Sequence, residues 1–162
     1  VGTLITDIKQ PILIVASEGR EEEVVTRLSR VGYDNTLGYL KGGIVAWKAA
    51  GKEIDTLTSI SADEFASLLP VTRGKVIDVR RNAEFDAGHV KDARNLPLDY
   101  INDHMSEFSS GEPYYLHCQG GYRSVVMASI LKSRGIDNVL NIEGGYEAIA
   151  QTSAPLVQME IA

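Results

Sequence analysis

The segment PYYLHCQGGYRSVVMASILKSRGIDNVLNIEGGYEAI, residues 113–149, determines the fold class. It alternates between two short apolar runs, at 114–118 and 138–142, and a longer run at 123–135 whose apolar residues have helical spacing and which ends at Gly135. A strand, a helix and a strand of these lengths form a right-handed crossover between parallel strands. We therefore predict an α/β fold, in which helices cover both faces of a parallel β-sheet.

Shorter patterns extend this sheet toward the N-terminus. Ser61 followed by Glu64 is typical of a capping box and predicts the start of a helix. The β-branched run KVIDV at 75–79 predicts a buried strand, and RNLPL at 94–98 predicts a short extended piece. The segment GGYEAIA at 144–150 predicts the last helix. These elements complete one module.

Residues 11–47 repeat the plan of residues 113–149 about one domain length earlier. Both stretches have a proline, an apolar run, a polar loop with an arginine, a helical segment, the pattern G-x-D-N and a double glycine. We predict a complete module over 57–162 and the C-terminal half of a degenerate copy over 1–56. Because the first copy lacks a counterpart of 58–102 and begins with valine, we expect a longer parent protein with an upstream domain.

The half module predicted at the N-terminus lacks the strand that would lie in the middle of such a sheet. Its apolar residues Val24, Val25, Leu28 and Trp47 then need a partner surface. We expect either a homodimer or a contact with another module, with Trp47 buried.

Cys118 is the only cysteine of the chain, and it closes the apolar run 114–118. The carboxyl ends of parallel strands are where α/β proteins bind ligands. Gly120 and Gly121 allow the backbone to turn its amides inward, the next helix adds unpaired N–H groups, and Arg123 adds a positive charge. Such a loop lowers the pKa of a thiol, so we predict a reactive thiolate rather than a small buried hydrophobic residue.

The motifs VIDVR, EFDAGHV, ARNLPL, HCQGGYRS and NIEGGYEA occur in this order within residues 57–152. Together they resemble a rhodanese domain. The resemblance implies a sulfurtransferase, in which a loop cysteine takes sulfane sulfur from thiosulfate or a persulfide. The cysteine becomes a persulfide and passes the outer sulfur to a thiophilic acceptor.

The same resemblance assigns roles to particular residues. Cys118 matches the sulfur carrier, and Asp78 and Arg80 match an ion pair that supports the loop. The six residues after the cysteine match the loop that binds the substrate sulfur: Gln119, Gly120, Gly121, Tyr122, Arg123 and Ser124. The resemblance implies no cofactor or metal beyond the covalent persulfide. Regular strand geometry would point His117 away from Cys118.

Two other interpretations stay open. Phosphatases and arsenate reductases of the same fold resemble the sequence too, but their loop is one residue longer than the four residues that separate Cys118 from Arg123. The smaller ring suits a single sulfur atom. The second alternative is a non-catalytic binding or regulatory module. The first copy fits that role, because Ala16 stands where Cys118 stands in the second.

The composition limits the cellular setting and the partners. With 44% hydrophobic and 23% charged residues, the 162-residue chain is typical of a globular protein. Its net charge of −6 disfavours nucleic acid as a partner. No apolar stretch is long enough to cross a membrane, and a lone cysteine suits a reducing compartment. We expect a cytoplasmic protein whose partners are a small sulfur donor and a small acceptor.

A truncated copy followed by a complete one resembles the arrangement of certain bacterial fusion proteins. In these, a metallo-β-lactamase-fold persulfide dioxygenase precedes two rhodanese modules. The iron site that this resemblance implies would belong to the upstream domain. No metal is expected to bind residues 1–162 themselves.

Overall fold

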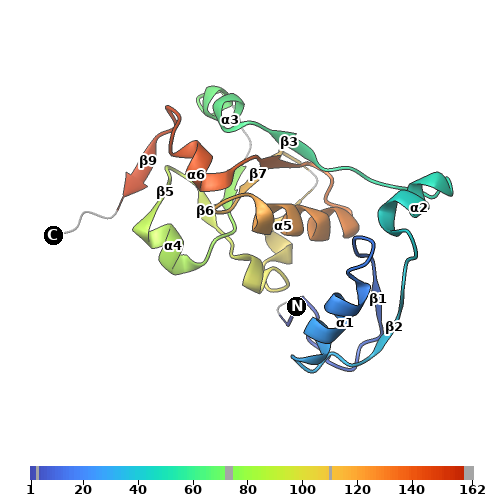
Figure 1. Ribbon diagram of the computed structural model, residues 1–162. Helices are drawn as coiled ribbons and strands as arrows, with labels where there is room; N and C mark the ends of the chain where they lie inside the picture. The colour runs from blue at the N-terminus through green and yellow to red at the C-terminus, as the bar shows by residue number, and fades with distance from the viewer. Residues whose placement is uncertain (3, 72–74, 110, 159–162) are drawn as a thin grey trace. The chain divides into compact units, whose positions relative to one another are not determined.

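The computed structural model describes residues 1–2, 4–71, 75–109 and 111–158. The chain forms two compact units, Val1–Thr56 and Leu57–Ala162. The larger unit has the predicted α/β fold with a parallel sheet (Figure 1). None of the helices in the described ranges is both long and apolar enough to span a bilayer.

Five parallel strands form the sheet of the larger unit. In spatial order they are β3 (Thr58–Ile60), β8 (Val139–Ile142), β7 (Tyr114–His117), β4 (Lys75–Asp78) and β6 (Arg94–Asn95). The central strands β7 and β4 pair with Ile77 opposite Leu116 and Asp78 opposite His117. Because both faces of these strands are covered, Val76, Ile77 and Tyr114–Leu116 are consecutive buried residues and do not alternate with exposed polar ones.

Helices cover both faces of this sheet, as predicted (Figure 1). On one face α5 (Tyr122–Ser133) and the short 3₁₀ turns η1 (Leu98–Tyr100) and η2 (Met105–Glu107) pack over a core that includes Leu116 and Met127. On the other face α3 (Ala62–Leu68) and α6 (Gly145–Ile149) enclose a core around Phe65 and Tyr115. Successive residues of β7 therefore serve opposite faces.

Two smaller features complete the larger unit. Helix α4 (Asn82–Ala87) follows β4, and the antiparallel pair β5 (Gly88–Val90) and β9 (Leu156–Gln158) joins the region after α4 to the C-terminal end of the unit. The sequence patterns did not indicate the β5–β9 pair, because each strand is only three residues long.

Most predicted element boundaries agree with the structure to within one to three residues. The Ser61 hydroxyl accepts a hydrogen bond from the Glu64 amide at 3.1 Å, so the predicted helix cap is confirmed. Helix α5 begins at Tyr122, one residue earlier than predicted. The piece predicted as extended over 94–98 pairs only at Arg94–Asn95 and then turns into η1.

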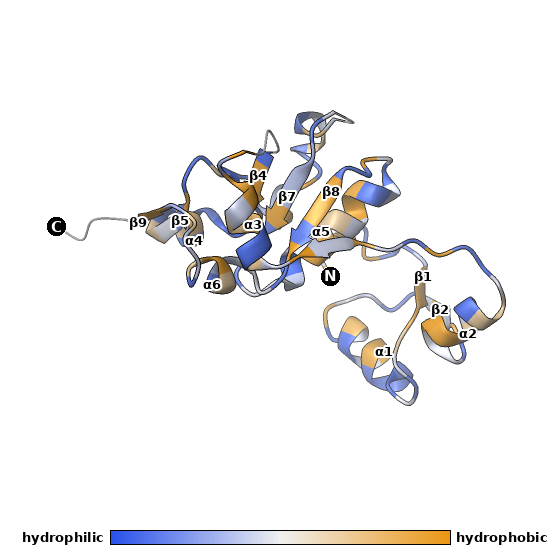
Figure 2. Cartoon of the chain, turned by 90° about the horizontal axis from the view of Figure 1, so that it is seen from above, coloured by the Kyte–Doolittle hydropathy of each residue, from blue (hydrophilic) through white to orange (hydrophobic). Residues whose placement is uncertain are grey.

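The smaller unit consists of β1 (Ile12–Ile14), α1 (Glu21–Ser29), β2 (Thr36–Tyr39) and α2 (Gly43–Ala49). Its two strands are parallel, and the element order is that of β7, α5, β8 and α6 in the larger unit. The orange colour of β1 in Figure 2 marks it as hydrophobic. Leu13 in this strand is 75% exposed, whereas Ile14 is buried. One face of this small sheet is therefore open within the unit.

Within the smaller unit Trp47 is not enclosed. Its ring is 40% exposed, and its indole N–H donates a hydrogen bond to the Glu53 carbonyl at 2.8 Å, so burial of Trp47 by a second copy or another module stays a prediction. Val24 and Leu28 are half-buried and Val25 is exposed. The physical reason is size, because two strands and two short helices cannot enclose a core.

Residues 57–162 expressed alone are expected to fold. Both clusters of buried apolar side chains in the larger unit are built from residues of that unit. Thermal unfolding followed by circular dichroism should give one cooperative transition. An unfolded fragment would show that the unit boundary at Leu57 is wrong.

Candidate active site

Cys118 directly follows β7 and begins the loop that leads into α5. Its side chain is only 2% exposed and belongs to the core cluster on the α5 face. This position is the carboxyl end of the central strand of a parallel sheet. The thiol is therefore enclosed by the loop that follows it.

Hydrogen bonds converge on the sulfur of Cys118. The Gly121 amide donates to Sγ at 3.2 Å, and the Ser124 hydroxyl lies 3.7 Å from it. Burial acts to raise the pKa of the thiol, but bonds from the amide and hydroxyl of Ser124 and from the amides of Gly121 and Arg123 outweigh this effect. The pKa of Cys118 is lowered, which favours the thiolate.

The first residues of α6 fix the direction of the loop peptides. The Cys118 carbonyl accepts a hydrogen bond from the Tyr146 amide at 2.7 Å, and the Gln119 carbonyl accepts one from the Glu147 amide at 3.1 Å. In a planar trans peptide the N–H points opposite to the C=O. The amides of Gln119 and Gly120 therefore point away from α6.

Gly145, the first residue of α6, is required by this contact. Gly145 has a φ of +58°, and a side chain there would overlap the carbonyl oxygens of Cys118 and Gln119. Gly121, at the start of α5, has a φ of +98°, which presents its amide to the sulfur. These glycines shape the backbone around Cys118.

A chain of buried polar groups continues behind Ser124. Its hydroxyl lies 2.8 Å from Oδ1 of Asn141, and the amide of Asn141 donates to the Ser59 hydroxyl at 3.2 Å. Ser124 and Asn141 are both buried. The chain fixes the Ser124 side chain against the sulfur, and the sequence patterns did not indicate Asn141 or Ser59.

Asp78 and Arg80 form a buried ion pair on the other side of the loop. Their side chains are 0% and 3% exposed, and an Arg80 Nη donates to the Asp78 carboxylate at 2.7 Å. The same guanidinium also donates to the Gly88 carbonyl at 2.6 Å and to Oε1 of Gln119 at 3.1 Å. It lies 4.1 Å from the centre of the Tyr146 ring. Arg80 thus ties β4, β5 and the loop together.

Arg123 has a partner that sequence reasoning missed. Both of its Nη atoms donate to the carboxylate of Glu84, each at 2.7 Å. These bonds lower the pKa of Glu84 to about 2 and raise that of Arg123. The sequence predicts a positive charge at the rim of the loop, but in the structure the Glu84 carboxylate neutralises the charge of Arg123. Glu84 opens the motif EFDAGHV, and only the fold brings it to Arg123.

The remaining residues near the loop differ in exposure. Tyr122 is 82% exposed. The Gln119 amide donates to the Glu147 carboxylate at 3.2 Å. His117 is fully buried, with Nε2 3.9 Å from Asp78, and burial lowers its pKa. The imidazole is therefore neutral. Among the described residues its polar neighbours are the Asp78 carboxylate and the Cys118 carbonyl, not the sulfur.

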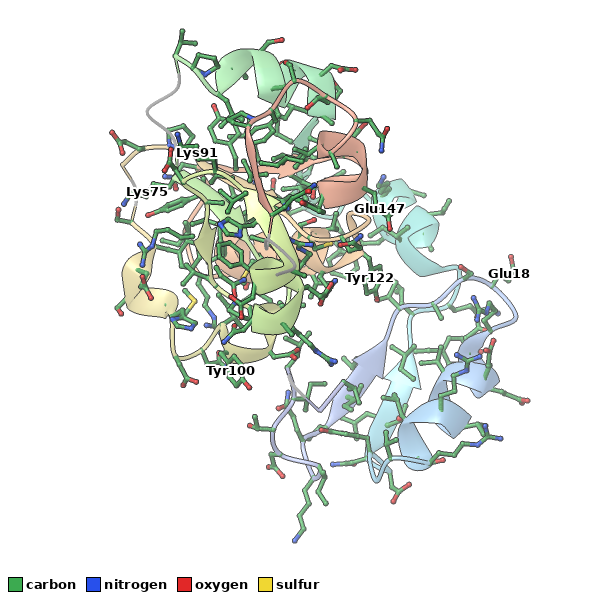
Figure 3. The ribbon with its side chains drawn as sticks, turned by 90° about the vertical axis from the view of Figure 1, so that its left-hand side faces the viewer. Glu18, Lys75, Lys91, Tyr100, Tyr122 and Glu147 are labelled. Atoms are coloured by element: carbon green, nitrogen blue, oxygen red, sulfur yellow. The ribbon has the colours of Figure 1, made fainter. Side chains whose placement is uncertain are left out.

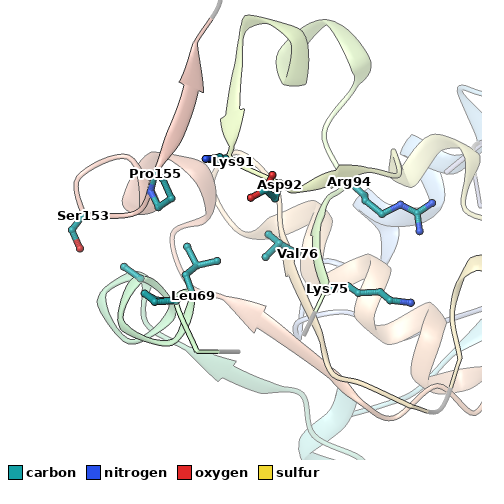
Figure 4. A pocket seen from close by; sticks show the side chains of 10 residues that line it. Leu69, Lys75, Val76, Lys91, Asp92, Arg94, Ser153 and Pro155 are labelled. Atoms are coloured by element: carbon teal, nitrogen blue, oxygen red, sulfur yellow. The ribbon is translucent and has the colours of Figure 1, made fainter. Parts of the chain in front are cut away.

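The larger unit has one hollow beside the loop and another away from it. One of about 530 Å³ adjoins the loop and is lined by Arg80, Glu84, Gln119 and Tyr146 among others. The other, of about 590 Å³, is shown in Figure 4, and none of its lining residues belongs to the loop. Two of its cations have partners, because Arg94 pairs with Glu107 and Lys75 lies 5.6 Å from the Tyr114 ring. The hollow beside the loop is thus the one relevant to Cys118.

No three His, Cys, Asp or Glu side chains gather into a metal-binding group within the described ranges. The chemistry that the site offers is that of an enclosed thiolate. Backbone amides and a hydroxyl hold the sulfur, and two arginine–carboxylate pairs brace the surrounding loop.

Comparison with known proteins agrees with this description. The rhodanese-like domain family matches residues 61–152. A sulfurtransferase from Allochromatium vinosum is 34% identical over 85 residues, which are 52% of this chain and 79% of the relative. A rhodanese-like domain protein from Staphylococcus aureus has a similar structure, with a TM-score of 0.55 and 35% identity over 57% of this chain and 91% of the other. The chain belongs to the rhodanese-like domain family.

Another relative is uncharacterised. It is a Bacillus subtilis protein that is 36% identical over 75 residues, and the match spans 46% of this chain and 60% of the relative. The chain thus covers less than two thirds of that protein. Two other relatives, from Allochromatium vinosum and Tolumonas auensis, are named as sulfurtransferases.

Alkylation of Cys118 should report the hydrogen bonds to its sulfur. Because the loop lowers the thiol pKa, the rate of reaction with iodoacetamide should reach its midpoint at a lower pH in the folded protein than in denaturant. Ser124→Ala should move the midpoint upward, whereas Ser133→Ala, at the far end of α5, should not. Equal midpoints for the folded and unfolded protein would contradict the geometry.

Gly145→Ala should destabilise the larger unit by about 2 to 4 kcal/mol, because it adds both backbone strain and overlap with two carbonyl oxygens. Gly135→Ala is the matched control. Gly135 also has a positive φ, but the space around it is open, so the cost should be about 1 kcal/mol. Chemical denaturation measures both, and equal losses would show that α6 does not press on the loop.

Proposed function

We propose that the larger unit is a sulfurtransferase that carries sulfane sulfur as a persulfide on Cys118. The observation that carries the proposal is the convergence of the Gly121 amide and the Ser124 hydroxyl on a buried Sγ. A cradle of N–H and O–H donors stabilises a sulfur anion without a base or a metal. The donors considered are thiosulfate and persulfides, and the acceptor is a thiophile such as cyanide, sulfite or a thiol.

The transfer proceeds in two displacements. The Cys118 thiolate attacks the outer sulfur of the donor, a new S–S bond forms, and the electron pair of the broken S–S bond leaves with the remainder of the donor. The acceptor then attacks the outer sulfur of the persulfide, and the electron pair of that bond returns to Cys118 as thiolate. The free cysteine and the sulfur-loaded cysteine alternate, as in ping-pong catalysis.

Phosphate chemistry is the less favoured function for this loop. Only four residues separate Cys118 from Arg123, and Arg123 gives both Nη groups to Glu84. A tetrahedral oxyanion needs a wider ring than these four residues provide and a guanidinium that is not already paired with a carboxylate.

The smaller unit is proposed to have no part in the chemistry. Ala16 lies after β1, and its carbonyl faces Gly43 as the Cys118 carbonyl faces Gly145. The backbone is similar, but alanine has no sulfur to load. A binding or regulatory role is the function that fits this unit.

The mass of the protein after exposure to a donor tests the proposal. Incubation with a persulfide or with thiosulfate should add about 32 Da to the wild type, and cyanide should remove it. Cys118→Ser should not gain mass and should lose at least about 90% of transfer, since a hydroxyl cannot carry sulfane sulfur. A folded Cys118→Ser variant that still transfers sulfur would overturn the assignment.

A further inference from the structure

The positive charges beside the Cys118 loop are already compensated. Arg80 is paired with Asp78 inside the protein, and its other donors are used by Gly88 and Gln119. The Nη groups of Arg123 are held by Glu84. Each guanidinium is paired with a carboxylate, so neither pair brings net positive charge to the loop.

A carboxylate lies next to the loop in addition to these pairs. Glu147 is exposed, its hydrogen-bond partner is the neutral amide of Gln119, and a Cβ at Gly120 would lie 3.9 Å from its Oε2. In Figure 3 it lies at the same end of the larger unit as Tyr122, whereas the labelled Lys75 and Lys91 lie at the other end. With the thiolate included, the mouth of the site carries net negative charge.

The hollow that adjoins the loop offers room for an organic group. Its volume is about 530 Å³, and its lining includes the Tyr146 ring, the Gln119 amide, the Gln158 amide and Ala87. The charged side chains that line it, Arg80 and Glu84, are both paired. Such a surface suits an uncharged group with both apolar and amide character.

We propose that the physiological donor is an organic persulfide whose organic part carries little net charge, in preference to the thiosulfate dianion. Repulsion from Glu147 is about twice as large for a dianion as for a monoanion at the same distance. The hollow binds the organic part, and the amide cradle receives the single sulfur. This inference rests on the proposed sulfur transfer and adds the class of donor.

The step needs no oxidant or other co-reactant. The Cys118 thiolate attacks the outer sulfur of the persulfide R–S–SH and forms a new S–S bond. The S–S bond of the donor breaks, and its electron pair leaves with the organic thiolate R–S⁻. The products are the Cys118 persulfide, which keeps the donor's proton, and R–S⁻, so atoms and charge balance.

The first test compares the reaction of two donors with two variants, each of which removes one negative charge from the protein. The probes are thiosulfate and the persulfide of N-acetylcysteine methyl ester, whose organic part is neutral. Because the donors differ in intrinsic reactivity, the measure is the rate of the 32 Da mass gain of each variant relative to the wild type, where about 32 Da is one sulfur atom. Glu147→Gln should raise the relative rate for thiosulfate about two- to fivefold more than that for the persulfide.

Glu112→Gln is the matched control. Glu112 is exposed and precedes β7, at the end of the strand opposite to Cys118. The substitution therefore makes the same change in net charge far from the site. It should change both rates equally. Added salt should accelerate the thiosulfate reaction of the wild type and diminish the effect of Glu147→Gln, since screening weakens the repulsion.

The second test narrows the hollow. Ala87→Phe places an aromatic ring in the wall of the hollow. Because the ring occupies space that the organic group needs, the half-saturating concentration of the organic persulfide should rise more than that of thiosulfate. Ala83→Phe lies on the same helix α4 outside the lining and should leave the ratio of the two concentrations unchanged.

The outcomes separate this inference from the proposed function. One outcome would overturn the class of donor and leave the sulfurtransferase assignment intact. In it Cys118 gains mass, Glu147→Gln changes the rates of both donors equally, and Ala87→Phe leaves the ratio of the two half-saturating concentrations unchanged. No mass gain from either donor would overturn both. A selective gain for thiosulfate in Glu147→Gln, with a selective loss for the persulfide in Ala87→Phe, supports the organic donor.

Discussion

The site depends on the hydrogen bonds that hold the Cys118 and Gln119 carbonyls against the first amides of α6. Because each peptide is planar, fixing these carbonyls also fixes the amides of Gln119 and Gly120 on the opposite side. The amides that follow them in the loop, such as that of Gly121, donate to the sulfur. Gly145 is the residue that allows the close approach. Gly145, at the start of the last helix, therefore helps to shape the loop around a thiol that lies 27 residues earlier in the chain. The strand end, the loop and the last helix act as one unit.

Ion pairs support this backbone arrangement from both sides. The Asp78–Arg80 pair is fully enclosed, and removing one partner would leave an uncompensated buried charge at a cost of about 3 to 5 kcal/mol. The Glu84–Arg123 pair is partly exposed and joins α4 to the first turn of α5. In both pairs the arginine charge is neutralised by a carboxylate of the protein itself. The anion at Cys118 is thus stabilised by amides and a hydroxyl, which is a setting for a monoanionic sulfur rather than for a phosphate group.

The local patterns in the sequence predicted most of the fold. Capping at Ser61, apolar runs at 75–79 and 114–118, and a thiol at the end of a strand followed by glycines are all short-range signals. The pairing of Arg123 with Glu84 was not predictable in this way, because 39 residues separate them and only the fold brings them together. The polar contact of Asn141 with Ser124 is hidden in a buried strand for the same reason. The exposure of Trp47 depends on how little of a sheet surrounds it, which a helical apolar pattern does not reveal.

We expect the loop amides to surround the transferred sulfur. A crystal structure of the protein after exposure to a persulfide donor tests this most directly, because it locates the outer sulfur relative to each amide. The map should show density for one additional atom on Sγ of Cys118, enclosed by the loop and within hydrogen-bonding distance of amides from Gln119 to Ser124. An outer sulfur that points away from these amides into solvent, or a sulfur carried elsewhere on the protein, would contradict it.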